Sequence, residues 1–312
     1  MSKYRNALPQ LNGTMFLTDS GLETILYFVD GFDMPEFASF PLLETEKGRA
    51  RIKDYYETHM AIAKSRNVGF ILDTPTWRAS SDWGTKLGYS AQSLDRANRE
   101  AVQFMLDLRD QHETPTSPIV VSGELGPRGD GYNPSELLEP DAAQAYHADQ
   151  MASFAAAGAD MVTALTITHV GEAVGITRAA QSVGIPVVIS FTTATDGCLP
   201  TGQTLGQAIE ETDAATENGP TYYMINCAHP THFQDALDTG AAWVKRIRGM
   251  RANASSKSHE ELDNSSELDS GDPVEFAQQY RALRRRMDHI SVLGGCCGTD
   301  HRHIEEIGSV CA

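Results

Sequence analysis

Short apolar segments rich in β-branched residues alternate along this chain with longer segments in which apolar residues recur at helical spacing. The short segments have strand length, and their nearly continuous apolar character is typical of strands buried on both faces of a parallel sheet. We expect eight strands, at residues 14–19, 68–74, 119–124, 161–167, 187–192, 222–227, 247–253 and 290–296. We expect helices at residues 47–66, 91–111, 141–157, 172–183, 205–217, 231–244 and 275–287, with a last helix from residue 300.

The order of these segments predicts an α/β fold in which strands and helices alternate. Eight such units favour a (β/α)8 TIM barrel, with an open doubly wound sheet as the alternative. No linker or internal repeat divides residues 1–312, so we expect a single domain. Functional side chains of such a barrel gather at the carboxyl ends of the strands.

Composition and charge narrow the kinds of partner. The hydrophobic fraction of 41% is sufficient for a packed core. The chain has 25 Lys and Arg against 42 Asp and Glu, a formal charge of −17, which disfavours nucleic acids and anionic membranes as partners. No segment approaches the ~20 apolar residues of a membrane span, and the first residues lack a signal-peptide core. We therefore expect a cytoplasmic protein with small-molecule partners, and a homo-oligomer is compatible with the sequence.

The segment 254–273 differs from the rest of the chain because it is polar, acidic and rich in Ser, with no apolar period. In a barrel it follows the seventh strand, on the side where the strands end. We interpret it as a long surface loop. The alternative is a lid that becomes ordered over the substrate.

Five cysteines at this density do not indicate a disulfide framework. Cys227 ends the sixth expected strand, and Cys296 and Cys297 end the eighth between glycines that permit a tight turn. Only the seventh strand separates these ends in a barrel, so the three thiols can converge. Three cysteines with a fourth position left open fit a catalytic Zn²⁺ site. Cys198 and Cys311 have no comparable context, and we interpret them as structural.

At these residues the chain resembles the homocysteine S-methyltransferase family, a family of zinc-thiolate barrel enzymes. The motifs Asn226-Cys227 and GGCCGT (residues 294–299) match its zinc motifs, and DSGLET (residues 19–24) is similar to its first-strand motif. The segment GELGP (residues 123–127) is similar to the glycine–proline turn after its third strand. The resemblance extends from about Leu17 to the last helix.

The resemblance implies a homocysteine S-methyltransferase in which Cys227, Cys296 and Cys297 bind Zn²⁺ and Asp19 faces the amino acid substrate. Leu165 stands where the family usually has a glutamate that holds the substrate amino group, and Ala194 stands where relatives often have another glutamate. Either another carboxylate takes this role, or the thiol acceptor differs. The candidate catalytic residues are Asp19 and Glu124, and the candidate substrate-binding residues are Asp19, Ser20, Glu23 and Asn253.

Zinc coordination deprotonates a thiol that is mostly protonated at neutral pH, so the acceptor becomes a thiolate nucleophile. We expect it to take a methyl group from a sulfonium-type donor, S-methylmethionine or S-adenosylmethionine, with homocysteine giving methionine. A cationic donor favours aromatic walls, for which Trp77, Trp83 and Tyr132 are candidates. The alternative is a zinc- and thiol-binding barrel protein that uses a different thiol or lacks turnover. A zinc hydrolase is less favoured because no clear general base accompanies the cysteines.

Overall fold

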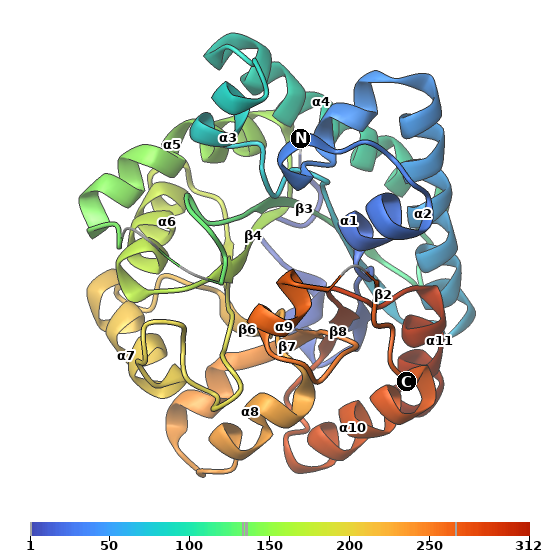
Figure 1. Cartoon of the computed structure of the whole chain (residues 1–312), viewed down its shortest axis with the longest axis vertical. Coiled ribbons are helices and arrows are strands. Elements are labelled where there is room, and N and C mark those ends of the chain that lie inside the picture. The colour runs from blue at the N-terminus through green and yellow to red at the C-terminus, as the bar shows by residue number, and fades with distance from the viewer. Residues whose placement is uncertain (1, 133, 135–136, 266) are drawn as a thin grey trace.

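The computed structural model describes residues 2–132, 134, 137–265 and 267–312. Eight parallel strands pair in sequence order and close into a barrel, with helices around its outside (Figure 1). The strands are β1 (Phe16–Leu17), β2 (Gly69–Asp73), β3 (Ile119–Leu125), β4 (Met161–Ile167), β5 (Val187–Phe191), β6 (Tyr222–Asn226), β7 (Ile247–Ala252) and β8 (Val292–Gly295). The predicted (β/α)8 barrel is confirmed, and the pairing of β1 with β8 excludes an open sheet.

Long helices follow most of the strands and cover the outside of the barrel. Capping boxes at Ser90 and Thr204 fix the first turns of α4 and α7, whereas Gly158 and Gly184 end α5 and α6 in the left-handed conformation. The longer helices in the described part of the chain are α2 (Glu46–Ser65), α4 (Ala91–His112), α5 (Pro140–Ala157), α6 (Val170–Val183), α7 (Leu205–Thr216), α8 (Pro230–Leu237), α10 (Pro273–Arg286) and α11 (His301–Cys311).

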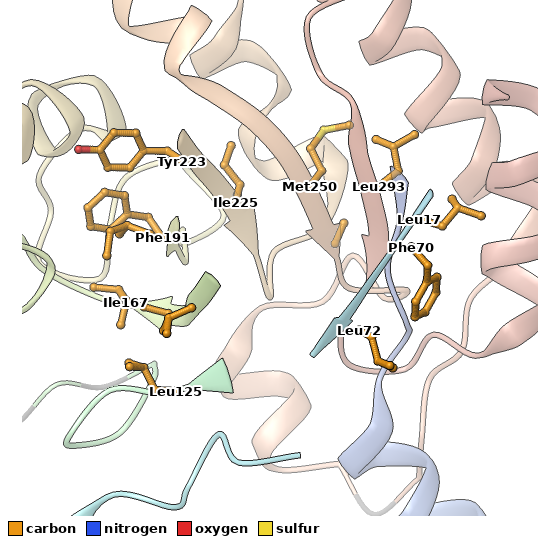
Figure 2. Packing of buried hydrophobic residues seen from close by; sticks show 14 of the residues in the cluster. Leu17, Phe70, Leu72, Leu125, Ile167, Phe191, Tyr223, Ile225, Met250 and Leu293 are labelled. Atoms are coloured by element: carbon orange, nitrogen blue, oxygen red, sulfur yellow. The ribbon is translucent and has the colours of Figure 1, made fainter. Parts of the chain in front are cut away.

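Alternate residues of each strand face the barrel interior and the helices. Near the start of the strands, the inward side chains form an apolar plug that includes Phe16, Ile71, Val120 and Val292. Outward side chains such as Leu17 belong to the larger cluster between strands and helices, part of which is shown in Figure 2. The plug closes one end of the barrel and leaves the carboxyl ends of the strands for polar groups.

Polar side chains replace the plug further along the same inward rows. Asp73, Glu124, Asn226 and Arg251 all lie at the carboxyl ends of their strands and are buried. Burial of charged and amide groups is costly unless they are paired or have a function. This polar layer therefore marks the functional end of the barrel.

Two expected elements differ from those in the structure. The helix expected at 231–244 ends at Leu237, because the backbone leaves the helical region at Asp238 (ψ 47°), and after Gly240 (φ 66°) the chain continues as a 3-10 turn, Ala242–Arg246. The segment 254–273 contains a short helix, α9 (His259–Asp263), which begins at a capping box formed by Ser258 and Glu261. It is thus not a structureless loop. Among the described residues, no helix is both long enough and apolar enough to cross a bilayer.

Candidate metal and substrate site

A cavity of about 360 Å³ opens at the carboxyl ends of the strands and contains the predicted metal ligands. Its walls combine an acidic floor, three cysteines and several aromatic side chains. Among the residues predicted from the sequence, those that line the cavity are Asp19, Ser20, Glu23, Trp77, Glu124, Tyr132, Leu165, Cys227, Cys296 and Cys297. Asn253 and Trp83 are buried, but they do not line this cavity.

The three predicted cysteine ligands meet at one point of the cavity. The Sγ atoms of Cys227, Cys296 and Cys297 all lie within 4.8 Å of one another. Strand β7 lies between their two strands, and its Arg251 and Ala252 carbonyl groups accept hydrogen bonds from the Cys227 and Cys296 amides at 3.1 and 2.8 Å. The convergence expected from barrel order is thus present in the structure.

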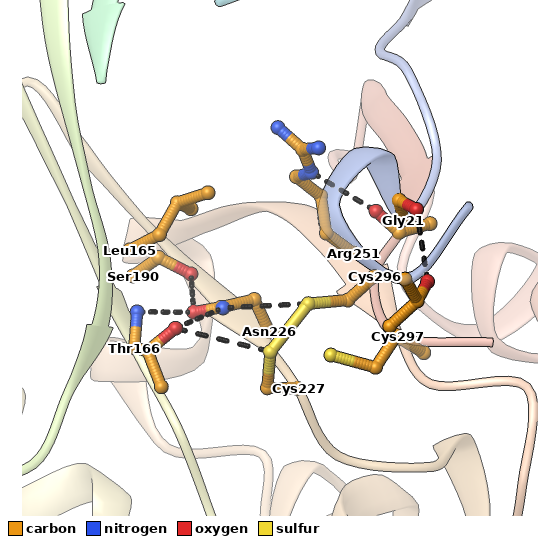
Figure 3. The surroundings of a disulfide bond; sticks show 12 residues. Gly21, Leu165, Thr166, Ser190, Asn226, Cys227, Arg251, Cys296 and Cys297 are labelled. Atoms are coloured by element: carbon orange, nitrogen blue, oxygen red, sulfur yellow. Dashed lines mark hydrogen bonds between the residues drawn. A yellow bond between two sulfur atoms is a disulfide. The ribbon is translucent and has the colours of Figure 1, made fainter. Parts of the chain in front are cut away.

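The structure joins Cys227 and Cys296 in a disulfide, with a Cα–Cα separation of 5.5 Å (Figure 3). This disulfide was not expected from the sequence, because five cysteines are an odd number and a low density for a chain of this length. The pair lies within the cluster of three cysteines, and Cys198, Cys297 and Cys311 are not part of a disulfide. A thiolate, not a disulfide, ligates zinc, so the three cysteines could hold a metal ion only with this pair reduced.

Asn226 organises the side of the cluster next to strand β4. Its Oδ1 accepts hydrogen bonds from the Thr166 amide at 2.8 Å and the Ser190 hydroxyl at 2.7 Å, and its Nδ2 donates to Thr166 Oγ1 at 2.9 Å. The same Nδ2 lies 3.9 Å from Cys296 Sγ (Figure 3). These contacts hold Thr166 in a left-handed conformation (φ 63°), which a β-branched residue rarely adopts. Asn226 was predicted only as part of a motif, with no role of its own.

A buried ion-pair network forms the floor of the cavity. The Arg251 guanidinium donates to Asp19 Oδ1 at 2.6 Å, to Asp73 Oδ2 at 2.8 Å and to the Gly295 carbonyl at 3.1 Å. Tyr55 donates to the other oxygen of Asp19 at 3.1 Å. Arg251 thus links strands β2, β7 and β8 and the segment that follows β1 around the three cysteines.

Burial dominates the protonation of these groups. It raises the pKa of Asp73 to about 6 and also raises the pKa of Asp19, although Arg251 acts in the opposite direction on both. Burial lowers the pKa of Arg251, but the two carboxylates outweigh this effect and raise it overall. Arg251 and Asp73 were not predicted as site residues. The available signal was a charged residue near the carboxyl end of each strand.

Glu124 lies beside this network but forms no ion pair with the described residues. Its side chain is only 8% exposed, lines the cavity and forms no hydrogen bond with another described residue. Burial and the nearby Asp73 carboxylate raise the pKa of Glu124 well above its ordinary value. A cationic group entering the cavity would stabilise the ionised form of Glu124.

The neighbouring predicted residues have partners within the protein. Glu23 accepts a hydrogen bond from the Ser39 hydroxyl at 2.7 Å, and burial raises its pKa. Ser20 Oγ lies 3.0 Å from the Tyr55 hydroxyl and 2.9 Å from His59 Nε2. The predicted carboxylates Asp19, Glu23 and Glu124 therefore lie at one cavity, and Glu124 has the least satisfied side chain.

Helix α9 brings a residue to the cluster that the sequence analysis did not predict. His259 Nε2 lies 2.5 Å from the Cys227 carbonyl, and its ring packs at 4.1 Å, centre to centre, against Tyr132. The Tyr132 hydroxyl lies 3.7 Å from Cys297 Sγ. The acidic segment 254–273 thus reaches the functional site. No sequence spacing relates His259 to the cysteines, since a long connection after β7 determines where it lies.

Comparisons with known proteins agree with this geometry. The model of the homocysteine S-methyltransferase family matches residues 17–311. A search of curated protein sequences gave no match. The metallated form of the homocysteine methyltransferase MmuM from Escherichia coli superposes with a TM-score of 0.73 at 16% identity, covering 97% of this chain and 98% of that chain.

The oxidized form of the same E. coli protein gives a TM-score of 0.74 at 17% identity, with the same coverage of both chains. At such low identity the structural likeness shows a common fold, whereas the family match over residues 17–311 shows kinship in sequence. The chain therefore belongs to the homocysteine S-methyltransferase family, and it is an enzyme of this methyl-transferring kind.

Proposed function

We propose that this enzyme is a zinc-dependent S-methyltransferase that transfers a methyl group from a sulfonium donor, S-methylmethionine or S-adenosylmethionine, to homocysteine. The observation that carries the proposal is the convergence of three cysteine Sγ atoms within 4.8 Å in the cavity at the carboxyl end of the barrel. Such a donor set, with access to a cavity for a further ligand, is the pattern of catalytic rather than structural zinc.

The cysteines fit this metal by chemistry and by spacing. Tetrahedral zinc–thiolate bonds of about 2.3 Å place ligand sulfurs about 3.8 Å apart, which the reduced cluster can adopt with small side-chain rotations. Cys227, Cys296 and Cys297 would hold the ion. When bound, zinc lowers the pKa of the acceptor thiol and so makes it a nucleophile at neutral pH.

The polar residues of the chain supply the binding of the acceptor. Glu124 is the best placed to hold the acceptor amino group, because its carboxyl group is buried and unpaired. It would replace the glutamate whose usual position is occupied by Leu165, a residue that lines the same cavity. Asp19 adds negative potential, while Arg251 and Tyr55 hold its carboxylate in place.

The aromatic side chains support binding of the donor. Trp77 and Tyr132 line the cavity near the cysteines, and aromatic faces attract sulfonium groups. Holding the methyl carbon in line between the donor and acceptor sulfurs supplies much of the acceleration, because methyl transfer needs no proton shuttle at carbon. The donor sulfur leaves as a neutral thioether.

The position of Leu165 also favours a second candidate, a thiol acceptor other than homocysteine. Leu165 places an apolar side chain in the cavity, and Arg251 already engages Asp19. An acceptor without an amino group would then be used as well as homocysteine. Comparison of homocysteine with 4-mercaptobutyrate, which lacks only the amino group, distinguishes the two candidates.

The experiment uses the reduced full chain with zinc, isotope-labelled homocysteine and each of the two sulfonium donors. The label separates by mass the methionine made from the acceptor from methionine that the donor leaves behind. We expect one zinc per chain and labelled methionine from the wild type, and loss of both in Cys297→Ala. Cys311→Ser is the matched control, because Cys311 lies in α11 outside the cavity. Zinc binding without labelled methionine from either donor would refute the proposed function.

A further inference from the structure

Arg78 is a second arginine of the cavity and differs sharply from Arg251. It follows strand β2, in the loop before helix α3 (Ser81–Lys86), and lines the same cavity as the cysteines. Its guanidinium lies over two indole rings, 4.8 Å from the centre of Trp77 and 4.1 Å from that of Trp83. Stacking on two rings restricts the rotamers of the side chain, so its charge has a defined position.

No carboxylate in the described part of the chain forms an ion pair with this guanidinium. Arg78 donates a hydrogen bond to the Glu36 carbonyl, its Nε is buried without a partner, and it has no ion pair within 4.0 Å among the described residues. Arg251, by contrast, contacts two aspartates. Burial lowers the pKa of Arg78, and the carboxylates of Asp130, Glu36 and Glu23 oppose this effect through longer-range attraction. A substrate anion would supply the missing partner.

The cavity therefore carries opposite charges on different walls. Asp19 and Glu124 form an acidic floor, whereas Arg78 belongs to an aromatic wall with Trp77 and Tyr132. The acceptor thiol takes the cysteine cluster and the acidic floor. The aromatic wall is left for the onium group of the methyl donor, and Arg78 is the cation on that wall.

We propose that Arg78 binds the carboxylate of the methyl donor, and that the enzyme selects onium donors that carry a carboxylate. A guanidinium presents paired N–H groups that match a carboxylate in geometry as well as in charge. The proposal rests on the proposed methyl transfer for its biological meaning, but binding of the donor can be measured without turnover.

The direct test is a titration that follows tryptophan fluorescence, since Trp77 and Trp83 contact the Arg78 guanidinium. The probes form two matched pairs, and only the first member of each pair carries a carboxylate. One pair is S-methylmethionine and (3-aminopropyl)dimethylsulfonium, and the other is trimethylglycine and choline. We expect the wild type to bind at least one carboxylate-bearing probe about ten- to a hundredfold more tightly than its partner, the range for a hydrogen-bonded charge. Arg78→Gln should remove this preference, and Arg78→Lys should retain part of it.

Arg99→Gln is the matched control, because Arg99 pairs with Asp95 on the exposed face of α4. Steady-state kinetics with homocysteine provide the second measurement, in which Arg78→Gln should raise the KM for the donor and leave that for homocysteine nearly unchanged. Equal affinities within both probe pairs, or an increase confined to the KM of homocysteine, would overturn the proposal. Preference for the carboxylate without methionine formation would support the Arg78 site and refute the proposed reaction.

Discussion

Replacement of Arg251 by methionine tests whether one guanidinium holds the floor of the site together. Met keeps much of the side-chain volume but leaves the carboxylates of Asp19 and Asp73 buried without a counterion. Breaking a buried pair from one side costs about 3–5 kcal/mol. An unfolding entropy of about 2.1 cal/mol/K per residue over 312 residues makes 1 kcal/mol equivalent to about 1.5 °C. We therefore expect the melting temperature to fall by about 5–8 °C.

The same substitution should make stability more dependent on pH. The pKa of Asp73 is raised to about 6 in the folded protein against about 3.9 when unfolded, so the folded state binds more protons in this range. The contribution of Asp73 to the free energy of unfolding is therefore present at low pH and is lost as the pH rises through about 6. Without Arg251 the folded carboxylates gain protons at still higher pH. The deficit of Arg251→Met should be smaller at pH 5 than at pH 8.

Calorimetry of the reduced, zinc-loaded protein at both pH values measures these effects. Arg248→Met is the control, because Arg248 lies on the same strand and donates only a 3.4 Å hydrogen bond to the Leu11 carbonyl. Adding Asp73→Asn to Arg251→Met should recover part of the loss, since one uncompensated charge disappears. A fall below about 2 °C for Arg251→Met, or a deficit independent of pH, would refute the view that Arg251 neutralises the floor.

Three further substitutions test other parts of the site. Glu124→Gln should raise the KM for homocysteine about tenfold, because a charged hydrogen bond to the amino group is lost, and Glu124→Asp should have a smaller effect. Initial rates measure the KM, and an unchanged value would contradict the role of Glu124. Asn226→Ala should cost about 1–3 kcal/mol, since the Thr166 amide loses its buried partner, and urea unfolding gives the value. Ser258→Ala should destabilise the first turn of α9 by about 1 kcal/mol and so increase amide hydrogen exchange over residues 259–263. Exchange equal to that of the wild type would show that the cap does not limit local unfolding of α9.

The barrel and the metal cluster were predictable because both depend on periodicity and chain order. Buried parallel strands have nearly continuous apolar runs, and consecutive strands pair in a barrel. Once eight units are counted, Cys227 and Cys296 must lie one strand apart at the same rim. The helix expected at 231–244 was wrong beyond Leu237, because the apolar pattern continues although the backbone leaves the helical region at Asp238 and is left-handed at Gly240.

The ion-pair network was harder to predict, because it forms only if side chains from three strands all point into the barrel at the same level. Asp19 was predicted as a site residue, but Asp73 and Arg251 look like ordinary polar residues at strand ends, and only the closed barrel shows that the three form one network. The same limit applied to His259, because a long connection rather than a regular element brings it to the cluster.

The network also connects the proposed acceptor site with the proposed metal site. The Arg251 side chain holds Asp19 and the Gly295 carbonyl, and its main-chain carbonyl accepts the Cys227 amide hydrogen bond. One residue thus positions the acidic floor and both strands that carry the sulfur atoms. A substitution that displaces Arg251 should weaken zinc binding and acceptor binding together. Glu124 and Arg78 form no hydrogen bond with either strand that carries the cysteines, so substitution of Glu124 should weaken binding of the acceptor alone and substitution of Arg78 binding of the donor alone.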